Sequence, residues 1–110
     1  MDMTVNELAK ACGFKSLTLP EGEREINGGY VGDLLSWVMG RAKENDAWIT
    51  IMSNVNVIAV ATLSDVSCVI FAEGVVPDEE LISLANDKGV NLLSSELAAY
   101  EIAVRISGIL

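Results

Sequence analysis

The sequence contains no histidine, only two cysteines and few basic residues. Without histidine, the chain lacks the side chain that most often acts as a general base or a metal ligand, so we expect no catalytic residue and no metal site. Seven basic residues against 16 acidic residues give a net charge of −9. This charge disfavours nucleic acid and anionic membranes as partners, because both would be repelled. An acidic surface also serves plain solubility.

The two cysteines lie far apart, Cys12 at the end of a predicted helix and Cys68 inside an apolar run. Neither has a neighbouring base to activate it, so we interpret both as free, buried thiols of a protein in the reducing cytoplasm. The first residues show no basic start followed by an apolar run, which is the pattern of a signal peptide. The longest apolar stretch, Val55–Leu63, is too short to cross a bilayer.

Apolar residues, by contrast, are abundant and make up 51% of the 110 residues. This length predicts a single domain over residues 1–110 that is large enough to form a core. The apolar fraction is high for so small a domain. It indicates that some apolar surface is reserved for a partner.

Short apolar segments alternate with segments of helical periodicity along the chain. The pattern predicts central strands over Ala47–Met52, Val66–Phe71 and Val90–Leu93, a further core strand over Ile26–Val31 and an edge strand over Lys15–Leu19. Helical segments between successive strands favour parallel pairing, because parallel strands need a crossover connection. We therefore predict a three-layer α/β/α domain with a mostly parallel central sheet of about 4–5 strands.

Residues that cap helices mark where the predicted helices begin and end. Thr4 and Glu7 have the spacing of a capping box, and Gly13 is placed to end that first helix. Asp78 and Gly89 bound a later helix in a similar way. The remaining helices are predicted to begin at Asp33, at Ser53 or Asn54, and at Ser94 or Ser95.

Two stretches of the sequence resemble the DRTGG domain family. The first is Ala47-Trp48-Ile49-Thr50 followed by the apolar helix from Asn54, where the family has a strand ending in Ile-Thr, a polar turn and an alanine-rich helix. The second follows the family's strand, glycine turn, proline-started helix, strand and final helix. It comprises Phe71-Ala72-Glu73-Gly74, Pro77, Leu84-Ala85, Val90-Asn91-Leu92-Leu93, Tyr100 and Ala103.

This family is similar to the N-terminal domain of the HPr serine kinase/phosphorylase, and it accompanies CBS pairs in some inorganic pyrophosphatases and the catalytic part of some phosphotransacetylases. The resemblance therefore implies a regulatory domain. The kinase chemistry belongs to a separate P-loop domain, and this sequence has no Gly-x-x-x-x-Gly-Lys-Ser/Thr motif, so we expect no enzyme activity and no cofactor. The five-residue motif that names the family is absent, and the turn Ile51-Met52-Ser53-Asn54 lacks the charged pair of many members.

A glycine-rich stretch with Gly28, Gly29 and Gly32 is predicted to form a loop between a strand and the following helix. Such a loop can hold a small anion or a nucleotide against the start of the helix. Asp33, however, places a negative charge where a phosphate would bind, and no lysine follows. Tight packing of the strand on the helix is the competing explanation for the glycines.

Polar residues also follow two of the predicted central strands. Thr50, Ser53 and Asn54 follow one strand, and Glu73 and Gly74 follow the next. Because open α/β sheets bind ligands at the carboxyl ends of their strands, these residues are the best candidate ligand site. Plain turns are the alternative explanation.

Three alternating carboxylates lie in a charged turn ahead of the first core strand. These are Glu21, Glu23 and Glu25. They lack the closely spaced ligands of a calcium loop, so a solvated turn is the simpler explanation.

The predicted helix Val55–Leu63 is apolar almost all round and therefore needs cover on more than one side. Either the final helix or a second copy of the chain supplies that cover. We predict a homodimer with Trp37, Val57 and Val60 as interface residues. The first functional hypothesis is thus a non-catalytic regulatory or interaction module that acts as a homodimer. The alternative is a domain that senses a nucleotide or another metabolite at the strand ends.

Overall fold

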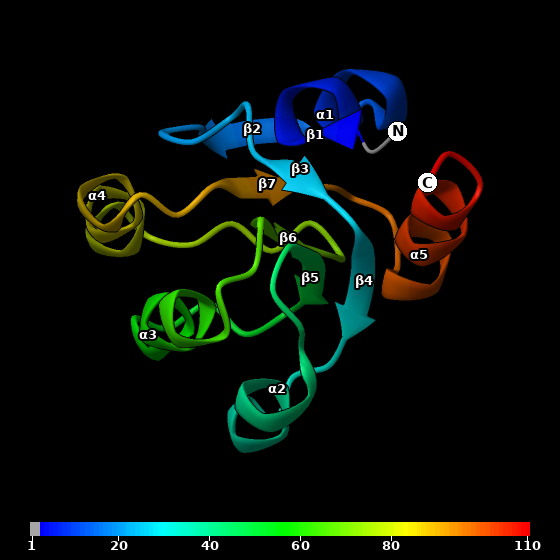
Figure 1. Cartoon of the computed structure of the whole chain (residues 1–110). Helices are drawn as coiled ribbons and strands as arrows, with labels where there is room; N and C mark the ends of the chain where they lie inside the picture. Colours follow the sequence, from blue (N-terminus) through cyan, green and yellow to red (C-terminus); the bar gives the residue numbers. More distant parts are fainter. Residues whose placement is uncertain (1–2) are drawn as a thin grey trace.

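A computed structural model describes residues 3–110; residues 1–2, part of the start without a signal-peptide pattern, lie outside it. A five-stranded sheet lies between two layers of helices (Figure 1). Its strands, in spatial order, are β2 (Lys15–Thr18), β7 (Leu92–Ser94), β6 (Cys68–Phe71), β5 (Asp46–Thr50) and β4 (Gly28–Val31). Strands β4 to β7 are parallel, and β2 pairs antiparallel with β7 at one edge. The predicted mostly parallel α/β sheet is confirmed, including its central strands and the edge strand.

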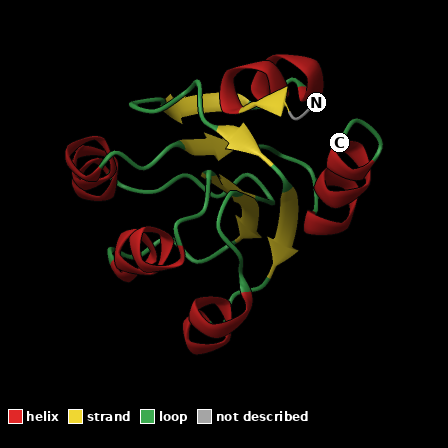
Figure 2. Ribbon diagram, in the orientation of Figure 1, coloured by secondary structure: helices red, strands yellow, loops and turns green. Residues whose placement is uncertain are grey.

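Each face of the sheet has its own helical layer (Figure 2). Helices α1 (Val5–Cys12) and α5 (Ala99–Ser107) cover one face, and α2 (Leu35–Arg41), α3 (Asn56–Ser64) and α4 (Glu79–Lys88) cover the other. Alternate strand residues supply the two cores, because successive side chains of a strand point to opposite faces. In β5, for example, Ala47 and Ile49 pack under the first layer, and Trp48 packs under the second.

Trp48 is the largest fully buried side chain and anchors the core under α2, α3 and α4. Its indole nitrogen donates to the carbonyl oxygen of Gly32 at 2.8 Å. The hydrogen bond offsets the cost of burying the N–H group, and the ring contributes roughly 2–3 kcal/mol of hydrophobic stabilisation. Gly32 is therefore fixed beside the carboxyl end of β5.

The predicted core strand Ile26–Val31 is wrong in one respect, because the structure divides it in two. Strand β3 (Glu25–Ile26) pairs with β1 (Met3–Thr4) in a separate two-stranded antiparallel sheet. The rest is β4, which pairs with β5 at the edge of the main sheet. Gly28 and Gly29 therefore belong to a strand and not to a loop. A Cβ atom on Gly28 would lie 3.1 Å from Asp46 Oδ1, so the glycine leaves room for that carboxylate.

Four of the predicted caps are present, and the predicted starts of three helices are wrong. The Thr4–Glu7 capping box, the Asp78 cap and the left-handed Gly13 and Gly89 at helix ends are confirmed. Helix α2 instead follows Leu34, because Asp33 bonds to another strand, and α5 follows Ala98, because Ser95 caps a turn ahead of it. At α3 the N-cap position is Val55, while Asn54 Oδ1 accepts from the amide of Asn56.

The prediction of Val57 and Val60 on α3 as interface residues is wrong, because both lie in the core and are only 0% and 3% exposed. Helix α3 lies between α2 and α4, and these two neighbours supply its lateral cover. The final helix, α5, lies on the opposite face of the sheet. The large apolar residues that α3 and its N-cap leave exposed are Val55 and Leu63, at 39% and 71%.

None of the helices within residues 3–110 combines the length and the apolar character that crossing a bilayer requires.

Candidate functional site

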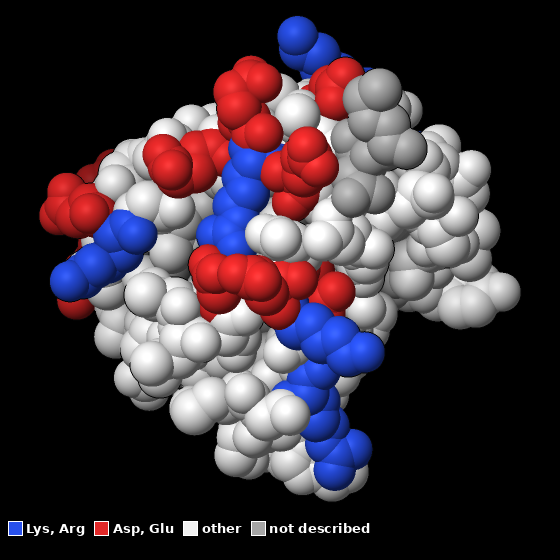
Figure 3. Space-filling view, viewed as in Figure 1, with Lys and Arg blue, Asp and Glu red and all other residues white. Residues whose placement is uncertain are grey.

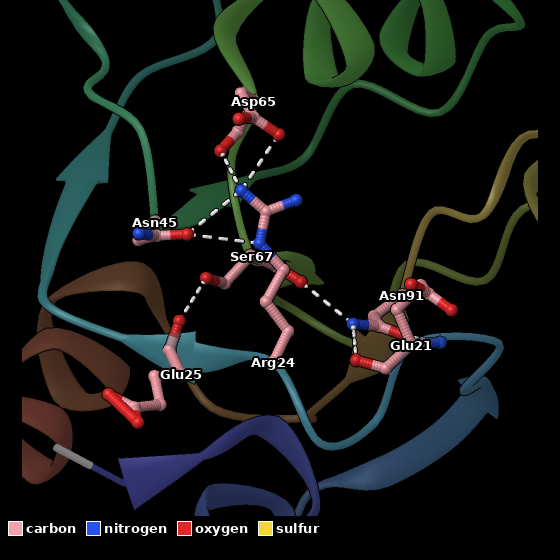
Figure 4. Close-up of polar contacts among 7 residues, drawn as sticks. All are labelled: Glu21, Arg24, Glu25, Asn45, Asp65, Ser67 and Asn91. Carbon is pink, nitrogen blue, oxygen red and sulfur yellow. Dashed lines mark hydrogen bonds and ion pairs between the residues drawn. The ribbon is translucent and has the colours of Figure 1, made fainter.

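The amino-terminal edge of the parallel sheet holds a dense polar cluster, which we call the amino-edge network (Figure 4). Arg24 is its centre. Its guanidinium donates to Asn45 Oδ1 at 2.9 and 3.0 Å and to the carbonyl oxygen of Asp65, and it pairs with the Asp65 carboxylate at 2.8 Å. The members of the network are Glu21, Arg24, Glu25, Asn45, Asp65, Ser67 and Asn91.

Asn91 holds the other side of this network and is 1% exposed. Its amide nitrogen donates to the carbonyl oxygens of Glu21 and Ser67, at 2.8 and 2.9 Å, and its Oδ1 accepts from the amide of Glu21 at 3.0 Å. The Ser67 hydroxyl donates to the carbonyl oxygen of Glu25. The network thus attaches the segment from Glu21 to Glu25 to the starts of β6 and β7.

The hydrogen bonds of the amino-edge network join separate parts of the chain to one another, so we assign the network a structural role. Of the three alternating carboxylates, Glu23 accepts from Asn6 Nδ2 at 3.0 Å. Within residues 3–110, no group of three or more acidic or cysteine side chains is arranged to hold a metal ion. Acidic and basic side chains lie next to one another over the upper and central part of the face seen in Figure 3.

The carboxyl-terminal edge of the sheet has two separate polar sites, and the first is built around Asp33. Its Oδ1 accepts from the Thr50 hydroxyl at 2.8 Å and from the amide of Ile51 at 3.0 Å. Thr50 Oγ1 also accepts from the amide of Met52 at 3.1 Å. Asp33 therefore joins the end of β4 to the turn after β5, which explains why it does not cap α2. Thr50 itself is buried, at 1% exposed.

The second site begins at Glu73 and Gly74, which follow β6. Both have a left-handed backbone, with φ of 61° and 74°. The amides of Glu73 and Gly74 donate to the carbonyl oxygens of Leu97 and Ser95, respectively, at 2.9 Å each. These hydrogen bonds attach the turn to the segment after β7. A Cβ atom on Gly74 would lie 2.5 Å from Glu96 Oε2, which shows that the Glu96 carboxylate rests against this glycine.

Next to Gly74 lies a cavity of about 390 Å³, which we call the strand-end pocket. Strand β2 enters it because its antiparallel pairing places Lys15 opposite Ser94, the last residue of β7. The charged and hydroxyl side chains that line it are Lys15, Ser94, Ser95, Glu96 and Arg105. The other lining residues are Cys12, Gly13, Gly74, Val76 and Leu97.

Arg105 is held at the wall of this pocket by one hydrogen bond from its Nη1 to the carbonyl oxygen of Cys12, at 3.2 Å. Burial raises the pKa of the Cys12 thiol, and the positive charge of Arg105 opposes that rise. Cys68, which is fully buried at the start of β6, has its pKa raised to about 12 by burial, against a smaller opposing effect of Arg24. Neither thiol is activated, so neither has the character of a nucleophile.

The structure separates the residues that the sequence had grouped as a ligand site. Gly28 and Gly29 lie level with the start of β5, at the amino-terminal edge. Gly32 and Thr50 lie at the carboxyl-terminal edge with the turn that holds Ser53 and Asn54. Of the predicted site residues, the strand-end pocket contains Gly74 alone.

Sequence reasoning missed Lys15, Glu96 and Arg105. The position of Glu96 just after a predicted central strand was an available signal, because ligands bind at the carboxyl ends of parallel strands. Lys15 and Arg105 gave no local signal. The antiparallel pairing of β2 and the packing of α5 bring them to that edge.

Comparisons with known proteins agree with this architecture. Residues 21–109 match the family described as the DRTGG domain. The fold is similar to the crystal structure of the CBS and DRTGG domains of the regulatory region of Clostridium perfringens pyrophosphatase, complexed with its activator diadenosine tetraphosphate, with a TM-score of 0.74 and 16% sequence identity. The match covers 94% of this chain and 46% of that chain, so this chain spans about half its length. No curated protein matches the sequence.

Proposed function

The chain belongs to the DRTGG domain family, and from this membership we propose that it is a non-catalytic regulatory module that acts as a homodimer in the cytoplasm. The match to the family covers residues 21–109, most of the chain. The similar pyrophosphatase chain is the regulatory region of an enzyme, and it contains DRTGG and CBS domains. A regulatory role of this kind needs a surface for a partner and no catalytic group.

The observation that supports a homodimer most directly is the apolar surface left exposed by α2, α3 and α4. Leu63 on α3 is 71% exposed, and Trp37 on α2 is 54% exposed. Between α3 and α4 lies an open groove of about 350 Å³ with a mainly apolar lining that includes Ile58, Leu63 and Leu84. The surface over α3, at the lower left of Figure 3, is largely without charged side chains. Exposed apolar surface of this kind marks interaction sites in soluble proteins.

Trp37 has the features of an interface anchor. Its ring lies 3.9 Å from the guanidinium carbon of Arg41, which stacks over it. The stacking holds a large, half-exposed aromatic ring in one orientation, so little side-chain entropy is lost when a partner covers it. The interface that we propose therefore consists of Trp37, Leu63 and the groove beside α3, and excludes the buried Val57 and Val60.

Sedimentation of the purified protein tests the homodimer. A Leu63→Glu variant places a charge on the proposed interface, and we expect it to be monomeric at concentrations where the unmodified protein is dimeric. Val104→Glu on α5 is the matched control, because Val104 is also an exposed helix residue, at 51%, but lies on the opposite layer. An unmodified protein that is monomeric at high micromolar concentration would refute the homodimer. Dissociation by Val104→Glu alone would move the interface to α5.

The non-catalytic part of the proposal has its own test. The purified protein should neither hydrolyse ATP nor phosphorylate a protein serine. Activity that persists through purification and disappears in Asp33→Asn or Glu73→Gln would contradict it, because these are the predicted acidic side chains at the carboxyl-terminal edge.

A second function, the binding of a small-molecule effector at the strand ends, is favoured by the strand-end pocket. This pocket lies where open α/β sheets bind ligands, and its volume lies within the range of small-molecule sites, roughly 300–1,000 Å³. A thermal-shift screen of nucleotides and phosphorylated metabolites tests this role. An increase in melting temperature with any of them supports it, and no increase across the screen counts against it.

A further inference from the structure

We propose that the strand-end pocket binds a small phosphate monoester that also carries hydroxyl groups, such as a sugar phosphate or a nucleoside monophosphate, with Lys15 and Arg105 on the phosphate and Glu96 on a hydroxyl. The inference rests on the proposed effector-binding role and names its chemistry. The pocket itself, its two cations and its one carboxylate are the observations that support it.

Positive charge is concentrated in the strand-end pocket. The chain has seven basic residues and a net charge of −9, yet two of the seven line this one pocket. Elsewhere Arg24 pairs with Asp65, and Arg41 stacks on Trp37. Lys15 and Arg105 make no ion pair with another side chain of residues 3–110. Their charges are therefore available to an anion.

Arg105 is positioned to donate to a ligand in the pocket. One of its N–H groups donates to the carbonyl oxygen of Cys12, which fixes the guanidinium at the pocket wall. A guanidinium has five N–H donors, so donors remain for a ligand. Lys15 enters from another element, at the start of β2. Two cations from separate elements suit a phosphate monoester, which carries close to two negative charges, better than a singly charged carboxylate.

The carboxylate of Glu96 restricts the chemical class of the ligand further. Its carboxylate rests against Gly74, in a pocket that also contains the hydroxyl groups of Ser94 and Ser95. A carboxylate accepts hydrogen bonds only, and it repels phosphate, so it faces a donor on the ligand. Hydroxyl groups on the carbon skeleton of a phosphate monoester supply that donor. Inorganic phosphate fills only the cationic part of the pocket.

The experiment is a titration of the isotope-labelled full chain, followed by amide chemical shifts, with ribose 5-phosphate, AMP, adenosine and inorganic phosphate as probes. We expect ribose 5-phosphate to shift the amides of Gly13, Gly74 and Leu97 and to bind more tightly than inorganic phosphate. Adenosine, without a phosphate, should cause no shift there. Tighter binding of AMP than of ribose 5-phosphate would identify the ligand as a nucleotide, and equal or weaker binding would identify it as a sugar phosphate.

Two variants of equal net charge separate a built site from general attraction. The double variant Lys15→Gln with Arg105→Gln should bind ribose 5-phosphate at least about tenfold more weakly, since two charge-assisted contacts are lost. Lys10→Gln with Lys88→Gln removes the same charge outside the pocket and should leave binding unchanged. Equal weakening by both variants, or no shift at the pocket amides with millimolar ribose 5-phosphate, would overturn the proposal.

Glu96→Gln provides a test that does not depend on the two cations. Glu96 is exposed, so the variant should fold normally. We expect it to weaken the binding of ribose 5-phosphate and not that of inorganic phosphate, because only ribose 5-phosphate has hydroxyl groups on a carbon skeleton that can donate to Glu96 while its phosphate contacts the two cations. If both probes bind this variant as they bind the unmodified chain, the assigned role of Glu96 is wrong. A probe that shifts amides elsewhere in the chain refutes this pocket and leaves the effector-binding role standing.

Discussion

At the amino-terminal edge of the sheet, Arg24 and Asn91 use their hydrogen-bonding groups on the chain itself, whereas at the carboxyl-terminal edge Lys15 and Arg105 line an open pocket. Both edges are polar, and both bring together residues that are distant in the sequence. The difference is whether the charges are already paired. A network whose groups bond one another stabilises one conformation, and unpaired charges around a cavity leave interaction energy for a ligand.

Replacing Asn91 by alanine should have the largest effect on stability. It removes two donors and one acceptor and leaves the buried carbonyl oxygen of Ser67 without this partner. Each unsatisfied buried group costs about 1–3 kcal/mol, so we expect a loss of about 3 kcal/mol in the free energy of unfolding. Urea unfolding measures it. Asn86→Ala, at an exposed position on α4, is the control and should change stability by less than about 0.5 kcal/mol.

Ligand binding separates the two edges in the same variant. While folded, Asn91→Ala should bind ribose 5-phosphate like the unmodified chain, because Asn91 lies at the opposite edge from the strand-end pocket. A small stability loss, or a large change in binding, would contradict the division of roles between the edges.

Arg24→Met should have the next largest effect on stability. We expect the free energy of unfolding to fall by about 2 kcal/mol, because the variant removes hydrogen bonds to Asn45 and to the Asp65 carbonyl. The ion pair should contribute little of this, since the Asp65 side chain is 52% exposed. Asp65→Asn isolates it, as the backbone acceptor remains, and should cost less than about 0.5 kcal/mol. If denaturant unfolding gives both variants the same loss, the ion pair and not the hydrogen-bond network holds this edge.

Cys68, beside the amino-terminal edge of the sheet, should make the stability of the protein depend on pH. Cys68 lies at the start of β6, and its pKa is raised from 9.0 to about 12. Between these values the unfolded thiol loses its proton while the folded thiol keeps it, so stability falls as pH rises above 9.0. From about pH 8 to about pH 10, the unmodified protein should lose about 1 kcal/mol more than Cys68→Ala. Equal losses measured by urea unfolding would refute this effect.

The sequence predicts the strands better than the sites because different physical quantities decide them. Strands such as β5 are buried on both faces, so their apolar character follows from local sequence. Gly28 and Gly29 have no side chains to show such a pattern, and their pairing with β5 decides their conformation. Asp33 has the local character of a helix cap, yet hydrogen bonds to Thr50 and Ile51 determine its position.

The two pocket cations illustrate the same limit. Lys15 and Arg105 lie near opposite ends of the sequence, and they line one pocket only because β2 pairs with β7 and α5 packs beside α1. Spacing along the chain contains no trace of that. The family resemblance predicted the fold correctly, but most of the residues that carried it are apolar core residues, and Gly74 is the one among them that lines the pocket.

Two glycines of the pocket allow the smallest and most specific prediction. Gly13 and Gly74 both have positive φ, 71° and 74°, so alanine at either position is strained and should cost about 1 kcal/mol. At Gly74 the new Cβ would lie 2.5 Å from Glu96 Oε2, whereas at Gly13 no atom of residues 3–110 apart from its chain neighbours would lie within 4 Å.

Gly74→Ala should therefore displace the Glu96 carboxylate and weaken the binding of ribose 5-phosphate. Gly13→Ala should leave the affinity for ribose 5-phosphate unchanged. Glu96 is exposed and its tip moves easily, so the displacement adds little to the loss of stability. Urea unfolding and the amide-shift titration together measure both quantities. Because the two positions have a similar positive φ, the backbone strain is comparable in the two variants, and a difference in binding points to the contact with Glu96. If the two variants bind ribose 5-phosphate equally, the carboxylate does not contact the ligand.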